Sequence, residues 1–166
     1  MFLLKMLFVC TGNTCRSPMA EFLTKSIFMK ENLSADVISA GTMVMERTPM
    51  SSSAIKALTD LNLLNNGLKQ DMLRYKSKLV NSEMVASSDF VFAMTYEHKT
   101  FLLNNFYDQK DKIFVLGDFV HGTRYDIADP FGKDVNAYKK CALEIYDLVN
   151  LMIKKITDVD HIRGGI

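Results

Sequence analysis

The residues most able to do chemistry lie in one short segment near the start of the chain: Cys10-Thr11-Gly12-Asn13-Thr14-Cys15-Arg16-Ser17-Pro18. The segment follows a buried apolar run and precedes a helical pattern that begins at Pro18. Gly12 and Asn13 both tolerate left-handed backbone angles, so the segment can curl with its N–H groups inward. Such a nest at a helix N-terminus binds a tetrahedral dianion, and Arg16 can hold two of its oxygens.

Cys10 lies at the base of this predicted nest. The donors that hold a phosphate also stabilise a thiolate, and comparable electropositive sites lower the pKa of a cysteine from about 8.5 to roughly 3.5–7.5. We therefore expect a lowered pKa for Cys10 and a nucleophilic thiolate at neutral pH. Ser17 can point its hydroxyl at this sulfur and still cap the helix that Pro18 begins.

The cysteines also have plainer interpretations. A cysteine at the end of a buried strand is often only a small hydrophobic residue. Here the Gly, Asn, Arg and Ser that follow Cys10 each meet a separate requirement of an anion site, which favours the functional interpretation. The spacing of Cys10 and Cys15 is not that of a zinc site, and Cys141 lies on an apolar helical stripe. We expect no metal and no cofactor.

Four short apolar runs and the helical patterns between them position this segment. The runs cover residues 5–10, 36–40, 89–94 and 112–116, and the helical patterns cover 18–30, 51–64, a stretch from Thr95 and a last stripe over 138–156. We expect Asn65-Asn66-Gly67 to stop the second helix, Thr95 to cap the third, and Gly117 to Gly132 to form a long loop.

Strands that alternate with helices in this way predict a parallel sheet covered on both faces. We therefore predict a three-layer α/β/α fold with a four-stranded parallel sheet in the flavodoxin-like order 2-1-3-4. In such sheets the ligand site lies at the carboxyl ends of the strands, where Cys10 falls.

Composition favours a single folded domain over residues 1–166. Hydrophobic residues make up 48% and charged residues 23%, and the formal net charge of +1 gives no global field for nucleic acid or an anionic membrane. No apolar run reaches the roughly twenty residues of a membrane-spanning helix. The apolar start, residues 1–10, lacks the leading cation and cleavage site of a signal peptide. Three cysteines do not suit a disulfide framework, so we expect a cytoplasmic protein.

Residues 10–21, Cys-Thr-Gly-Asn-Thr-Cys-Arg-Ser-Pro-Met-Ala-Glu, resemble the phosphate loop of low-molecular-weight protein tyrosine phosphatases. The resemblance continues at residues 39–42, 93–95 and 129–132 and so extends over nearly the whole chain. It implies a hydrolase in which Cys10 attacks phosphorus to form a cysteinyl-phosphate, Arg16 holds the equatorial oxygens, and Asp129 is the general acid and then the base. It also implies that the phosphoryl group is bound by Thr11, Gly12, Asn13, Thr14, Cys15, Arg16 and Ser17.

Asp129 suits that role on independent grounds. It follows the fourth predicted strand in the long loop, so it can fold over the same edge as Cys10. One carboxyl can protonate the leaving group and later activate water. Taken alone, an Asp-Pro pair is usually a turn. Asp126 is the competing candidate, but it lacks the Pro-Phe-Gly that follows Asp129.

The resemblance leaves three points open. It implies that Cys15 forms a reversible disulfide with Cys10, and the alternative is that Cys15 is only a wall of the loop. Relatives place a His that supports the loop Asn through a Ser, here Ser39, whereas residues 74–77 read Arg-Tyr-Lys-Ser, so the support of Asn13 is in question. We expect His98 to be a solvated helix residue.

Thr14 bears on the substrate. Tyrosine phosphatases of this family usually have a bulky Ile or Leu there, and Thr resembles the bacterial protein arginine phosphatase branch. A hydroxyl-bearing wall and an acidic partner such as Asp129 suit a polar, planar phosphoguanidine. We predict protein phosphoarginine as the substrate, with phosphotyrosine as the alternative. Phe131 and residues 43–45 are expected at the mouth of the pocket or in the core.

Two further functions are weighed against this one. An arsenate reductase would need two more relay cysteines on a mobile segment, and only Cys141 remains. A non-catalytic phosphate-binding module would need neither Cys10 nor Asp129, and the sequence contains both. The expected partners are phosphorylated proteins, with a kinase of opposite activity as the functional counterpart.

Overall fold

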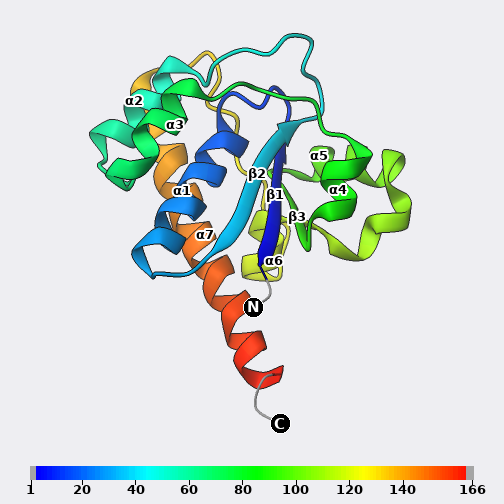
Figure 1. Cartoon of the computed structure of the whole chain (residues 1–166). Helices are drawn as coiled ribbons and strands as arrows, with labels where there is room; N and C mark the ends of the chain where they lie inside the picture. The colour runs from blue at the N-terminus through cyan, green and yellow to red at the C-terminus, as the bar shows by residue number, and fades with distance from the viewer. Residues whose placement is uncertain (1–2, 164–166) are drawn as a thin grey trace.

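Four parallel strands form the centre of the computed structural model, which describes residues 3–163 (Figure 1). They are β1 (Leu4–Cys10), β2 (Ala35–Gly41), β3 (Phe90–Ala93) and β4 (Ile113–Val115), in the order β2-β1-β3-β4. The predicted sheet and its strand order are therefore confirmed. Cys10 pairs with Gly41 and Val9 with Ala93, so the carboxyl ends of three strands meet at one edge.

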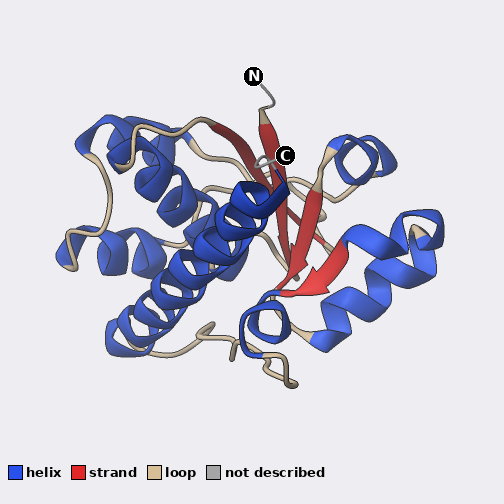
Figure 2. Ribbon diagram, turned by 90° about the horizontal axis from the view of Figure 1, so that it is seen from below, coloured by secondary structure: helices blue, strands red, loops and turns tan. Residues whose placement is uncertain are grey.

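Helices cover both faces of the sheet (Figures 1 and 2). One face carries α1 (Arg16–Lys30), α2 (Ser52–Asp60), α3 (Lys69–Arg74), α6 (Leu116–His121) and the long α7 (Val135–Arg163), and the other carries α4 (Ser82–Ser87) and α5 (Tyr96–Asn105). Met6 and Phe8 of β1 belong to the larger core under α1 and α7, while Leu7 and Val9 belong to the smaller core under α4 and α5. This alternation explains why β1 reads as one continuous apolar run.

Several boundaries differ from the sequence prediction. α1 begins at Arg16, two residues before Pro18, and α2 ends at Asp60 because the chain turns through Asn62, whose φ is 51°. The segment expected to stop that helix instead opens a short 3₁₀ helix (Asn66–Leu68), in which the Asn65 side chain accepts from the Gly67 N–H. A second 3₁₀ helix, Tyr107–Lys112, precedes β4.

The expected long loop from Gly117 to Gly132 is partly helical. α6 takes its first residues and ends at His121, where Gly122, with a φ of 72°, forms the C-cap. Gly117 packs so closely on Tyr125 that a Cβ atom there would lie 2.5 Å from the Tyr125 ring. This contact returns the chain toward the sheet edge, so the segment that holds Asp129 reaches the end of β1.

A single domain over residues 1–166 stays a prediction, since residues 1–2 and 164–166 lie outside the described part; Met1 and Phe2 of the apolar start are among them. No helix among residues 3–163 is long and apolar enough to cross a membrane.

Candidate active site

The segment after β1 forms a loop whose carbonyl oxygens accept hydrogen bonds from backbone groups of residues outside the loop. The carbonyl oxygens of Cys10, Thr11 and Thr14 accept hydrogen bonds from the backbone N–H groups of Thr42, Met43 and Ser51, respectively. The helix that follows, α1, has Cys15 at its N-cap position with no side-chain cap bond. The uncapped first turn of α1 therefore faces the loop with N–H donors and the positive end of the helix dipole.

Backbone conformation in the loop depends on Asn13 and on a glycine outside the motif. Asn13 has a φ of 55°, as predicted, but Gly12 does not have a positive φ. Gly41, at the end of β2, lies so close to the loop that a Cβ atom there would clash with the Thr11 carbonyl oxygen and lie 3.1 Å from the Asn13 Cβ. Gly41 thus lets β2 lie directly against the loop.

Cys10 lies at the base of a cavity of about 220 Å³. The cavity is lined by Cys10, Thr11, Gly12, Thr14, Cys15, Arg16, Asp129 and Phe131. Only 3% of Cys10 is exposed, and its Sγ lies 2.9 Å from the Ser17 hydroxyl. Ser17 therefore faces the sulfur as predicted. It does not cap the helix, because it is the second residue of α1. The sulfur faces space for an oxyanion.

The pKa of the Cys10 thiol is raised from its ordinary value, which is opposite to the predicted direction. Burial is the largest cause, because it removes water from the thiolate. The Ser17 hydroxyl, the backbone N–H groups of Ser17 and Asn13, and the Arg16 guanidinium all lower the pKa against this effect. Ionisation of Cys10 in the free site therefore depends on these donors.

Arg16 and Asp129 meet above the sulfur. Arg16 donates from one nitrogen to the Ile127 carbonyl oxygen at 3.0 Å, and a second nitrogen lies 3.1 Å from Asp129 Oδ2. Arg16 is buried, whereas half of the Asp129 side chain is exposed. The Phe131 N–H donates to Asp129 Oδ1 at 3.1 Å, which fixes the Asp-Pro turn.

The competing carboxylate lies elsewhere. Asp126 accepts from the Tyr96 N–H at the start of α5 and lies 3.8 Å from Arg124, and it does not line the cavity. Asp129 is therefore the carboxylate that the fold brings to Cys10.

The cavity mouth matches the sequence prediction in part. Thr14 and Phe131 both line the cavity, and Phe131 is 77% exposed rather than part of the core. Met43 and Met45 are also exposed, so the core interpretation is wrong for them, but they do not line the cavity.

The three cysteines are free thiols in the structure. Cys15 Sγ lies 3.4 Å from the Tyr138 hydroxyl and 3.7 Å from the Thr14 hydroxyl, so Cys15 forms part of the loop wall. The disulfide with Cys10 stays a prediction. Burial raises the pKa of Cys141 to about 12, which leaves that thiol protonated.

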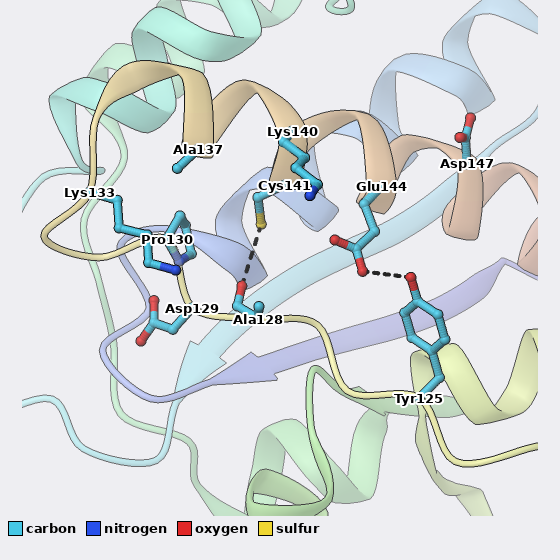
Figure 3. A pocket seen from close by; sticks show the side chains of 10 residues that line it. All are labelled: Tyr125, Ala128, Asp129, Pro130, Lys133, Ala137, Lys140, Cys141, Glu144 and Asp147. Carbon is cyan, nitrogen blue, oxygen red and sulfur yellow. Dashed lines mark hydrogen bonds between the residues drawn. The ribbon is translucent and has the colours of Figure 1, made fainter.

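A larger cavity of about 540 Å³ lies beside the site, between α7 and the segment before it (Figure 3). It shares Asp129 with the smaller cavity but does not include Cys10. Tyr125 donates to Glu144 across one end of it, and Cys141 contacts the Ala128 carbonyl oxygen at 3.9 Å. The chemistry of the loop therefore belongs to the smaller cavity.

Sequence reasoning missed two residues that contact the loop. Tyr75 donates to Asn13 Oδ1 at 2.6 Å, at the position where a His was expected and not found. His98 is 3% exposed rather than solvated, and its Nε2 lies 2.8 Å from the Thr11 hydroxyl. The predicted cap at Thr95 is confirmed, and its hydroxyl lies 3.0 Å from His98 Nδ1. A signal for His98 was present, since it lies one turn into a helix that starts at the site edge.

His98 gives the folded chain a measurable pH dependence. Burial, with a contribution from Arg16, lowers the pKa of His98 from 6.5 to about 4. Between these values the unfolded chain takes a proton that the folded chain does not, so this contribution to the free energy of unfolding falls as pH falls. The slope is at most about 1.4 kcal/mol per pH unit.

We therefore expect His98→Gln to unfold with a weaker pH dependence than the parent between pH 6.5 and 4. Urea unfolding at several pH values measures it. His121→Gln, at an exposed position, is the control and should follow the parent. Parallel curves for the parent and His98→Gln would show that His98 titrates normally.

Comparisons with known proteins agree with this geometry. Residues 5–160 match the family model described as low molecular weight phosphotyrosine protein phosphatase. A protein-arginine-phosphatase of Bacillus subtilis is 37% identical over 150 residues, covering 90% of this chain and 95% of that protein. A low molecular weight protein-tyrosine-phosphatase, PtpB, of Staphylococcus epidermidis is 29% identical over 147 residues, covering 89% and 95%.

A solved structure of YwlE arginine phosphatase is also similar, with a TM-score of 0.82 and 34% identity over 93% of this chain and 96% of that one. It is a cysteine-to-serine mutant whose active-site serine is phosphorylated.

Proposed function

The chain belongs to the low molecular weight phosphotyrosine protein phosphatase family and is a cysteine-dependent phosphatase, and we propose that protein phosphoarginine is its preferred substrate. The observation that carries the catalytic part of the proposal is the cavity, which is lined together by the Cys10 thiol, the Arg16 guanidinium and the Asp129 carboxylate. Similarity to a protein-arginine-phosphatase and the Thr14 wall support the choice of phosphoarginine.

In the proposed first step, Cys10 Sγ attacks phosphorus, the S–P bond forms and the P–N bond breaks. Arg16 and the first-turn N–H groups of α1 hold the three phosphoryl oxygens, over which the charge of the loose transition state is spread. The Ser17 hydroxyl and Arg16 favour the thiolate that attack requires. A serine that replaces cysteine in a related arginine phosphatase is phosphorylated, which supports Cys10 as the acceptor.

Asp129 completes the proposed cycle. In the free site it pairs with Arg16. An entering phosphoryl group would replace Asp129 as the partner of Arg16, which frees the carboxyl to protonate the departing guanidine nitrogen. Asp129 then takes a proton from water, the water oxygen attacks phosphorus, the S–P bond breaks and inorganic phosphate leaves.

We further propose that the substrates of this protein are proteins modified by a kinase of opposite activity. We place this protein in the cytoplasm, where a reducing environment keeps an active-site thiol free.

Phosphotyrosine is the alternative substrate, and Thr14 is the residue that separates the two. Thr14→Ile should lower kcat/KM for a phosphoarginine peptide and raise it for a phosphotyrosine peptide, changing the ratio by about tenfold or more. The apolar side chain removes a polar wall group and adds surface for an aromatic ring. The measurement is kcat/KM on both peptides under reducing conditions, with Thr59→Ile on α2, remote from the cavity, as the control. An unchanged ratio would mean that Thr14 does not select the substrate.

A further inference from the structure

A buried hydrogen-bond network lies beneath the loop, on the side away from the cavity. It begins at Tyr75, which follows α3 and is 7% exposed. The Tyr75 hydroxyl donates to Asn13 Oδ1 at 2.6 Å and lies 2.8 Å from Ser39 Oγ. Ser39, on β2, in turn donates to Glu21 Oε2 at 2.6 Å. Tyr75 thus joins the loop to β2 and α1.

Asn13 connects this network to Ser17, the residue next to the sulfur. Its Nδ2 donates to Ser17 Oγ at 2.8 Å and to Ser39 Oγ at 3.0 Å. Ser17 Oγ lies 2.9 Å from Cys10 Sγ. Because Ser17 accepts from Asn13, its single proton has two acceptors within reach, Cys10 Sγ at 2.9 Å and the Ala40 carbonyl oxygen at 3.3 Å, and the sulfur is the nearer.

Two donors set the orientation of the Asn13 amide. The Tyr75 hydroxyl and the Lys78 backbone N–H both donate to Asn13 Oδ1, at 2.6 and 3.0 Å. A flipped amide would direct its NH₂ group at these donors and leave Ser17 facing an acceptor oxygen. The Lys78 N–H, which can only donate, opposes the flip, and the shorter bond from Tyr75 holds the same oxygen, so together they keep Nδ2 on the side of Ser17.

The ring of Tyr75 is fixed independently of its hydroxyl. It packs edge-on against Phe22 of α1, with ring centroids 5.8 Å apart, and the Lys78 ammonium lies 5.6 Å from the ring centroid. Burial raises the pKa of Tyr75, and the charges of Glu21 and Cys10 act in the same direction. The hydroxyl therefore stays protonated at the pH values at which a phosphatase is assayed.

We propose that Tyr75 is a positioning residue that acts through Asn13 to aim the Ser17 hydroxyl at Cys10 Sγ. Tyr75 does not touch substrate. The proposal rests on the proposed function only where turnover is concerned, because the state of the Cys10 sulfur can be measured without any substrate.

The test is Tyr75→Phe, which keeps the ring and its packing and removes only the hydroxyl. The rate of Cys10 alkylation by iodoacetamide is followed against pH, because the thiolate is the reacting form. Tyr75→Phe should move the midpoint to higher pH, and Tyr107→Phe, at an exposed tyrosine remote from the site, should leave it unchanged. Turnover of an aryl phosphate should fall by about tenfold in kcat, with a smaller change in KM.

A double variant tests the route. Ser17→Ala removes the donor nearest the sulfur and should by itself raise the alkylation midpoint. If Tyr75 acts through Ser17, adding Tyr75→Phe to Ser17→Ala should shift the midpoint little further. An additive shift, or an unshifted midpoint in Tyr75→Phe alone, would overturn the proposal. A shifted midpoint in a protein that hydrolyses no phosphate ester would instead refute the proposed function and leave the role of Tyr75 standing.

Discussion

Cys10→Ser is expected to lose turnover by about three orders of magnitude or more while still binding inorganic phosphate. A serine hydroxyl occupies the same place at the base of the cavity, but it is far less ionised than a thiol at neutral pH. The groups proposed to bind the phosphoryl oxygens, Arg16 and the first turn of α1, are not changed by the substitution. Steady-state hydrolysis of an aryl phosphate measures the first effect, and titration calorimetry with phosphate measures the second.

The matched control is Cys141→Ser, which changes a buried thiol on α7 outside the smaller cavity. It should retain most of the parent turnover. Substantial turnover in Cys10→Ser would refute covalent catalysis by the sulfur. Loss of both turnover and phosphate binding would indicate that the substitution disrupts the loop, and a circular dichroism spectrum and melting curve would then identify misfolding.

Asp129→Asn is expected to lose about a hundredfold in kcat/KM on a phosphoarginine peptide and less than about tenfold on an aryl phosphate with an acidic phenol. A good leaving group departs without a proton, whereas a guanidine nitrogen needs one. The amide of Asn can still accept from the Phe131 N–H, so the Asp-Pro turn should persist. The measurement is kcat/KM on both substrates, which reports the steps up to release of the leaving group and not the later hydrolysis of the cysteinyl-phosphate.

Asp126→Asn provides the comparison, because this carboxylate is close in sequence but lies outside the cavity. It should affect both substrates equally and weakly. Equal losses on both substrates in Asp129→Asn would remove Asp129 from the role of general acid.

Local patterns were sufficient to predict the sheet and the loop. Each strand is a short apolar run buried on both faces, and the end of the first one led directly to Cys10 and Arg16. The Asp-Pro turn also has a local signal, because the Asp129 side chain bonds the backbone two residues on. These features depend on neighbours in sequence, so the sequence is informative about them.

The supporting contacts were not predictable in the same way. Tyr75 lies 62 residues from Asn13, and His98 lies 87 residues from Thr11, so only the fold brings them to the loop. His98 read as solvated because its helix, α5, shows no clear apolar face in sequence. Tyr75 stood where a histidine was expected, and nothing in the sequence indicated that a phenol reaches the same amide.

The predicted direction of the shift in the Cys10 pKa was wrong for a related reason. The motif shows the donors that lower the pKa, but it does not show how completely the sulfur is buried. The balance between desolvation and hydrogen bonding depends on packing around the whole loop.

The central claim is that a phosphoryl group passes through the Cys10 sulfur. The most direct measurement is rapid acid quenching during turnover of an aryl phosphate, followed by peptide mapping by mass spectrometry. We expect one phosphoryl group on the peptide that contains Cys10, absent from Cys10→Ala, which has no nucleophile at that position, and enriched in Asp129→Asn, in which water is activated more slowly. Product release in a burst with no phosphoryl group on Cys10, or with one on another residue, would contradict the account.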